Sequence, residues 1–306
     1  MINPAFTKNK ALKNLEKGGI NRLPSYFKQE LPEQIVLEKV KLILDLNLHT
    51  VCQEAHCPNL NSCFKRNRLT FLILGDICTR HCRFCAVKKT NNNNLFLDLD
   101  EPYRINEAVK TLGLKFVVIT SVSRDDLIDG GSGIFAKTVK LIKAFNQEIK
   151  IELLIPDFGG NLSSLKEILE AGPDIVGHNL ETVKRLYKDL RPEADYALSL
   201  KILLKIKEFN PYILTKSSLM LGLGEKENEV YEAMQDLRKS KCDILTLGQY
   251  LAPSKQHYPV KEFISLKQFK RYKQMGLSLG FKEVLSAPKV RSSYQADKIY
   301  VSATNI

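Results

Sequence analysis

The sequence predicts an α/β protein built as a partial, TIM-type barrel of six strand–helix units, with an extension at each end. Short apolar runs alternate strictly with stretches of helical periodicity, and this alternation implies parallel strands joined by right-handed crossovers. A chain of 306 residues with 44% hydrophobic content can bury a core of this size as one domain. Polar motifs follow the apolar runs, where the chemistry of a β/α barrel lies. Spacing alone leaves a full barrel or an open doubly wound sheet as alternatives.

The expected elements follow in order along the chain. Residues 1–34 are basic and polar, with a Gly18-Gly19 break and with Pro24 and Pro32, which indicates an arm over the body. An amphipathic helix is expected at 33–46, and four asparagines at 91–94 form a linker. The expected strands are 70–74, 116–120, 149–155, 174–177, 213–219 and 244–247. The expected later helices are 105–112, 131–147, 161–170, 180–189, 195–209, 227–240 and 266–279.

The charge and the cysteines restrict the partners and the compartment. A net charge of +12 and a pI near 9.2 favour acidic partners. The 46 basic residues are spread without a basic run or an aromatic-rich motif, so an acidic protein is favoured over nucleic acid. No run of 18 or more apolar residues indicates a membrane span, and the N-terminus lacks the apolar core of a secretory signal. Seven cysteines, six of them in two tight triplets, indicate metal binding in a reducing compartment, so we expect a cytoplasmic protein.

Three cysteines with CxxxCxxC spacing follow the first expected barrel strand. Cys78, Cys82 and Cys85 would fill three corners of a four-iron cluster and leave the fourth iron without a protein ligand from this loop. An open coordination position makes a metal site catalytic rather than structural. Soft thiolates select iron–sulfur clusters or zinc over hard cations. The alternative is a structural zinc loop, which would need His81 or a distant residue as its fourth ligand.

A second triplet precedes the first. Cys52, Cys57 and Cys63 have a CxxxxCxxxxxC spacing, which suits a loop around a second cluster. From spacing alone, a zinc site or free thiols remain open. Cys242 stands alone before a strand and is interpreted as a small buried hydrophobe.

The string TFLILGDICTRHCRFCAVKK around the CxxxCxxC loop resembles the radical S-adenosylmethionine (SAM) signature, and its flanks resemble the lipoyl synthase family. The resemblance covers roughly residues 20–298 and includes the piece RLPSYFKQELP. It implies a partial barrel of the radical SAM type, with an arm and auxiliary-cluster loop (1–66), a barrel (67–260) and a C-terminal extension (261–306). It also implies two 4Fe–4S clusters, the second held by Cys52, Cys57 and Cys63. The chain departs from the family pattern at Ser123, Gly177, Ser218 and Ala287.

Further site residues follow from the motifs and from this resemblance. The motif RSSY at 291–294 implies Ser293 as the fourth ligand of the auxiliary cluster, with Ser292 as the fallback. His178 is interpreted as a structural histidine at a strand end. The candidates for contact with SAM follow the second, fourth and fifth strands: Ser121, Arg124, Asp125, Asn179, Glu181 and Lys216.

The resemblance also implies a reaction. The open iron at Cys78, Cys82 and Cys85 would bind SAM, and the radical formed from SAM would take hydrogen from an octanoyl chain. Two sulfur atoms, supplied by the auxiliary cluster, would enter at C6 and C8 of the octanoyl group on a lysine. Implied partners are lipoyl carrier domains of 2-oxoacid dehydrogenase acyltransferases and of the glycine cleavage carrier protein, and an electron donor such as flavodoxin or ferredoxin. No nucleic acid and no membrane are expected.

Two rival functions remain from the sequence. A radical enzyme of biotin synthesis or of methylthiolation would keep the CxxxCxxC loop but lack the second triplet together with RSSY. A zinc-stabilised nucleic-acid binder would suit the charge.

Overall fold

The computed structural model describes residues 24, 27, 31–92 and 95–305. Most of the arm predicted for residues 1–34, and half of the asparagine linker, therefore lie outside the described residues. No helix among the described residues combines the length and the apolar character that crossing a bilayer requires.

A curved sheet forms the body of the molecule, with its strands in the order β1-β2-β5-β6-β7-β8-β9-β10. β1 pairs antiparallel with β2, and the other neighbours pair in parallel. All six predicted strands are confirmed, and β10 adds a seventh parallel strand. The strands are β1 (His49–Thr50), β2 (Thr70–Ile73), β5 (Phe116–Ser121), β6 (Lys150–Leu154), β7 (Ile175–Gly177), β8 (Leu214–Leu221), β9 (Ile244–Gln249) and β10 (Glu283–Ser286).

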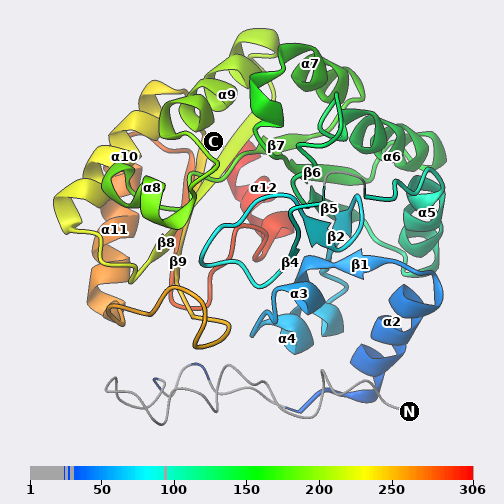
Figure 1. The fold of residues 1–306 in the computed structure, drawn as a ribbon, viewed down its shortest axis with the longest axis horizontal. Helices are drawn as coiled ribbons and strands as arrows, with labels where there is room; N and C mark the ends of the chain where they lie inside the picture. Colours follow the sequence, from blue (N-terminus) through cyan, green and yellow to red (C-terminus); the bar gives the residue numbers. More distant parts are fainter. Residues whose placement is uncertain (1–23, 25–26, 28–30, 93–94, 306) are drawn as a thin grey trace.

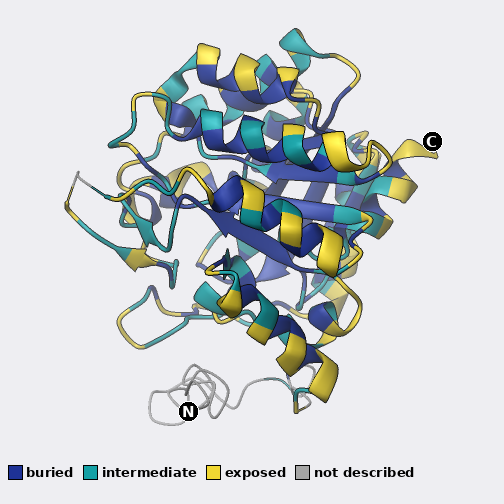
Figure 2. Ribbon diagram, turned by 90° about the vertical axis from the view of Figure 1, so that its right-hand side faces the viewer, coloured by how far each residue is buried: buried dark blue, intermediate teal, exposed yellow. Residues whose placement is uncertain are grey.

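The sheet curves as an arc with helices outside it (Figure 1). The strands are buried while the outer faces of the helices are exposed (Figure 2), as expected for amphipathic helices around a sheet covered on both faces. Side-chain caps begin several helices: Asn161 accepts from two backbone N–H groups of α7, and Ser265 accepts from Gln268 of α11. The helices between the strands and after β9 are α5 (Glu101–Thr111), α6 (Ser132–Phe145), α7 (Leu162–Glu170), α9 (Tyr196–Phe209), α10 (Glu227–Lys239) and α11 (Leu266–Ser278).

The helix predicted at 180–189 is wrong over its first half. Glu181 has φ of +69°, and its backbone pairs with β8: its N–H donates to Ser218 O at 2.9 Å, and its carbonyl accepts from Met220 N at 2.8 Å. Helical structure starts only at Lys184, with the 3-10 turn η5 (Lys184–Leu186) and the short α8 (Tyr187–Leu190). Glu181 therefore pairs with β8 as an isolated bridge, and helical structure begins three residues later, at Lys184.

The N-terminal end of the sequence supplies elements around the open side of the arc. α2 (Gln34–Asp45) confirms the helix predicted there and leads into β1. The second cysteine triplet lies on two short helices, α3 (Val51–Glu54) and α4 (Leu60–Lys65), which the sequence predicted only as a loop. Figure 1 shows α3 and α4 beside the gap between the first and last strands.

A C-terminal helix, α12 (Ala296–Thr304), lies inside the arc (Figure 1). Ile299 and Ala303 pack with Ile175, Leu214 and Ile244, which lie at or near the N-terminal ends of β7, β8 and β9. An apolar plug thus closes the interior at the end opposite the cysteine loop. The sequence analysis did not predict this helix.

Candidate active site

The CxxxCxxC loop follows β2, at the carboxyl edge of the sheet. A two-stranded ladder of β3 (Ile77–Cys78) and β4 (Lys88–Lys89) brings its two ends together. The backbone N–H groups of Arg80 and Ser123 donate to the Cys78 sulfur at 3.4 and 3.3 Å. Two donors and a closed loop hold the first thiol in a fixed position.

Arg80 connects this loop to the barrel through ion pairs. Its guanidinium donates to Asp125 at 2.7 and 2.9 Å and to Asp157 at 2.6 Å, and its side chain is buried. The guanidinium holds the pKa of Asp157 at about 2, although burial alone would raise it. Because bidentate Arg–carboxylate pairs are both strong and directional, Arg80 fixes the cysteine loop over β5 and β6.

Burial raises the pKa of Cys85 to about 12, and the neighbouring Cys82 and Cys78 add to the rise. Burial also raises the pKa of Cys82, while Arg191 opposes the rise. The three thiols therefore lie close enough to interact electrostatically, and burial disfavours the thiolate forms of Cys82 and Cys85.

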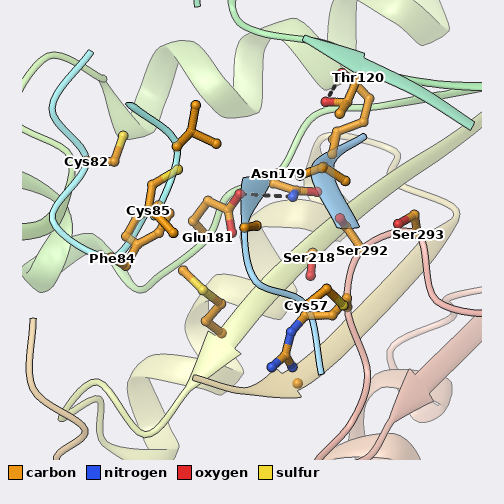
Figure 3. Close-up of a pocket in the computed structure, with 18 of the residues that line it drawn as sticks. Cys57, Cys82, Phe84, Cys85, Thr120, Asn179, Glu181, Ser218, Ser292 and Ser293 are labelled. Atoms are coloured by element: carbon orange, nitrogen blue, oxygen red, sulfur yellow. Dashed lines mark hydrogen bonds between the residues drawn. The ribbon is translucent and has the colours of Figure 1, made fainter. Parts of the chain in front are cut away.

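A cavity of about 380 Å³ opens below the loop. In Figure 3, Cys82, Phe84 and Cys85 lie on one side of it, while Cys57, Ser292 and Ser293 lie on the other. A second cavity of about 310 Å³ adjoins it. The residues that line both are Cys52, Cys57, Thr70, Arg291 and Ser293.

The second cavity contains the second cysteine triplet. Cys52, Cys57 and Cys63 all line it, and Ser293 lines it with them, whereas Ser292 lines only the larger cavity. Burial raises the pKa of Cys63 to about 11, with Cys57 adding to the rise, and raises the pKa of Cys52 further. These couplings place the three thiols near one another.

The C-terminal segment closes over this triplet. Asn59 donates to Lys289 O at 2.6 Å, Thr70 Oγ1 donates to Ser293 Oγ at 2.8 Å, and Arg68 pairs with Asp297 at 2.7 Å. Three contacts across more than two hundred residues of sequence thus join residues 59–70 to residues 289–297, which include the RSSY motif.

The two cysteine triplets suit iron–sulfur clusters better than single metal ions. All seven cysteines are free thiols. No three Cys, His, Asp or Glu side chains in the described part of the chain converge as the ligands of one metal ion do. A four-iron cluster takes each ligand on a different iron, so its thiols stand apart around a cube.

The candidate SAM contacts fall into two groups. Ser121, Asn179 and Glu181 line the large cavity, and Asn179 Nδ2 donates to Glu181 Oε1 at 2.9 Å (Figure 3). The hydroxyl of Ser121 is buried and has no hydrogen-bond partner among the residues that the structure describes, so it can bind a ligand in the cavity. Burial raises the pKa of Glu181, although Arg191 opposes the rise.

The other three candidates have side chains committed to protein partners, and none lines the cavity. Arg124 is buried against Asp126 and the carbonyls of residues 95 and 96. Asp125 accepts from Arg80 and from Thr79. Lys216 pairs with Glu152 at 2.8 Å inside the barrel, where both side chains are 3% exposed. The structure does not bring these three to the site.

Two arginines of the site were missed. Arg191 lines the cavity next to Cys82, and no motif marks it. Arg291 Nη1 donates to Gln249 O at 3.2 Å. Burial raises the pKa of Cys57, and the charge of Arg291 opposes that rise. Arg291 is the first residue of RSSY, so that motif was the available signal.

His178 is satisfied within the protein, as the sequence analysis predicted. Its Nδ1 donates to Ile155 O at 2.9 Å, and its Nε2 lies 3.0 Å from Ser199 Oγ. Burial lowers the pKa of His178 to about 4.

Comparisons with known proteins agree with this fold. The family model described as "Radical SAM superfamily" matches residues 72–237. The solved structure of HydG, a maturase of the FeFe hydrogenase, has a TM-score of 0.56 at 17% identity, over 98% of this chain and 71% of that chain. The structure of methylornithine synthase has a TM-score of 0.51 at 16% identity, over 86% of this chain and 89% of that chain. Fold and cysteine loop together define a radical SAM enzyme, a class that binds a 4Fe–4S cluster and SAM.

The sequence relatives narrow this class. A lipoyl synthase of Caldicellulosiruptor saccharolyticus is 52% identical, with 87% of this chain and 92% of that protein covered. A lipoyl synthase of Thermus thermophilus is 49% identical over 92% of this chain and 87% of that protein. A model of the N-terminal domain of lipoyl synthase matches residues 3–57. The chain belongs to the lipoyl synthase family, whose substrates are lipoyl carrier domains.

Proposed function

We propose that the two cysteine triplets hold two 4Fe–4S clusters with separate roles in the lipoyl synthase reaction. This reaction is the radical-mediated insertion of two sulfur atoms at C6 and C8 of a protein-bound octanoyl-lysine. One observation carries the proposal: the two triplets open on adjoining cavities, and the wall of the larger cavity includes cysteines of both. A substrate chain in that cavity would have both clusters within reach.

Cys78, Cys82 and Cys85 would hold the first cluster and leave one iron for the amino and carboxylate groups of SAM. When bound, that cluster supplies the electron that cleaves SAM and so generates the radical that takes hydrogen from octanoyl carbons. Ser121 would donate to or accept from SAM through its hydroxyl, which has no partner in the described part of the chain. Asn179 and Glu181 supply a half-buried amide and carboxylate in the same cavity.

Cys52, Cys57, Cys63 and Ser293 would hold the second cluster, the proposed source of sulfur. Ser293 is preferred over Ser292 because it lines the smaller cavity together with all three cysteines. An oxygen ligand on one iron is harder than thiolate, so that iron would be the easiest to detach. Arg291, beside Cys57, would offset part of the negative charge of the thiolates.

The division into three parts, the carrier proteins, the electron donor and the compartment are also proposals. The described sheet spans the three predicted parts, since β1 belongs to 1–66 and β10 to 261–306. The +12 charge supports acidic octanoylated carriers, namely 2-oxoacid dehydrogenase acyltransferases and the glycine cleavage carrier protein. A small acidic flavodoxin or ferredoxin would supply electrons. Two sets of free thiols support a reducing compartment, the cytoplasm.

Paired triple variants test the division of roles. Full reconstitution should give about eight irons per chain. The Cys78→Ala, Cys82→Ala, Cys85→Ala variant should keep about half of the iron and lose all SAM cleavage. The variant with alanine at the other three cysteines should still make 5′-deoxyadenosine but no lipoyl product, read by mass spectrometry of the carrier. Normal lipoylation by the second variant would show that residues 51–63 are structural.

A further inference from the structure

Thr70 lies where the two cavities meet. It is the first residue of β2, its side chain is buried, and it lines both cavities. Its hydroxyl donates to Ser293 Oγ at 2.8 Å. Its backbone N–H forms a hydrogen bond to the Cys52 thiol and thereby opposes the effect of burial on that pKa. One residue thus contacts two of the four proposed ligands of the auxiliary site.

The direction of this hydrogen bond suits a serine that must bind metal. A hydroxyl oxygen has two acceptor lone pairs. Because Thr70 is the donor, it occupies one lone pair of Ser293 Oγ and leaves the other for iron. The bond to Thr70 can therefore persist when Ser293 has lost its own proton to become a ligand.

The two partners also differ in rigidity. Thr70 is fixed in the sheet, opposite Val118 of the parallel neighbour β5. A β-branched side chain on a strand has few χ1 states. Ser293 lies in the turn between β10 and α12, where no ladder of backbone hydrogen bonds fixes it. The partner that a β-ladder fixes is thus Thr70, and Ser293 lies in a turn.

We propose that Thr70 is a positioning residue for the auxiliary site, which holds the Ser293 oxygen in register with Cys52. This inference rests on the proposed function, because it assumes that Ser293 is a ligand. Partners that orient metal ligands typically change metal affinity 10- to 100-fold when they are removed. Thr70 would therefore set how firmly the serine-bound iron is retained.

The test measures iron release rather than turnover. The full-length chain with alanine at Cys78, Cys82 and Cys85 is reconstituted anaerobically, so that all its iron belongs to the auxiliary site. Release of iron to a chelator is then followed in four further variants: Thr70→Val, Thr70→Ser, Thr246→Val and Ser293→Ala. Thr246 is the matched control, because it is a buried threonine of the same sheet whose hydroxyl has no partner among the described residues.

We expect Thr70→Val and Ser293→Ala each to release one iron of four at least about 10-fold faster than the parent. Thr70→Ser, which keeps the hydroxyl, and Thr246→Val should match the parent. Thr70→Ala, which also lacks the hydroxyl, replaces the valine variant if that variant does not fold.

Three results would overturn the inference. If Ser293→Ala releases iron faster but Thr70→Val does not, Ser293 is a ligand that Thr70 does not position. If neither variant differs from the parent, Ser293 is not a ligand, and the proposed function fails at that point. If Thr246→Val releases iron as fast as Thr70→Val, the effect comes from a general destabilisation of the sheet.

Discussion

Replacing Gly248 by alanine should displace the segment that carries Ser293. A Cβ at Gly248, near the end of β9, would lie 2.0 Å from the carbonyl oxygen of Val290 and 2.8 Å from its carbon. These are backbone atoms, which cannot rotate away as a side-chain end can. To reach the 3.4 Å of ordinary contact, the chain at Val290 must move by about 1.4 Å.

The cost has two parts. Overpacking of this kind costs about 1–3 kcal/mol. A shift of that size three residues from Ser293 would also stretch its 2.8 Å hydrogen bond to Thr70 beyond bonding distance, at about 1 kcal/mol. We therefore expect the free energy of unfolding of the metal-free protein to fall by about 2–4 kcal/mol.

Two assays check this expectation in Gly248→Ala. Denaturant unfolding measures the stability, and iron counting after reconstitution measures the auxiliary cluster, which should be depleted while the cluster of the radical loop remains. Gly133→Ala is the matched control, because its Cβ would meet nothing closer than a side-chain oxygen of Asp129 at 3.3 Å. Unchanged stability and a full iron content in Gly248→Ala would refute the argument that Val290 and Ser293 depend on this close approach.

Three further predictions follow. The lowered pKa of His178, about 4, means that the unfolded chain takes up this proton first, so stability should fall as pH falls from about 6.5 to 4. His178→Gln should flatten that part of a plot of Tm against pH, and an equally steep plot would contradict the assignment. Arg80→Gln leaves the buried Asp157 carboxylate without its cation and should cost about 3–5 kcal/mol at pH 7. In the wild-type protein the depressed pKa of Asp157 gives stability that is present above pH 3.8 and lost toward pH 2; in the variant, acidification should instead recover stability, as Asp157 becomes neutral. Finally, association with an acidic octanoylated carrier, measured by stopped flow, should slow as salt shortens the Debye length below about 10 Å, and an on-rate indifferent to salt would leave the +12 charge without a role.

The sequence predicted the parts of the fold that local pattern determines. Continuous apolar runs such as 116–120 are buried on both faces, and they became parallel strands close to their predicted bounds. The region 180–189 failed because the apolar spacing of Leu180 and Val183 is that of a helix, while pairing with β8 holds Glu181 in a left-handed backbone conformation. Such pairing depends on a strand that lies far along the chain, so no local window contains it.

The site residues were likewise predicted only where local sequence determines them. The six cysteines of the triplets could be found from their spacing and from resemblance. Lys216 was chosen because the resemblance assigns the lysine and the glycine-rich turn at the fifth strand to the cofactor pocket. Its side chain instead pairs with Glu152, 64 residues away, inside the barrel. Arg124 could have been excluded, because Asp126, its ion-pair partner, is two residues further on. The role proposed for Thr70 depends on a contact across 223 residues that no spacing reveals.

The closure of the second triplet by the C-terminal segment has a consequence for biosynthesis. Asn59 and its acceptor Lys289 are separated by 230 residues. At about 5–20 residues per second, a ribosome needs roughly 10–50 s to synthesise the chain between them. During that time Cys52, Cys57 and Cys63 cannot have Ser293 beside them, and the barrel lacks its plug, α12. The proposed second cluster, with Ser293 as its oxygen ligand, would therefore assemble only on the completed polypeptide, and until then the three thiols of the nascent chain would depend on a reducing environment.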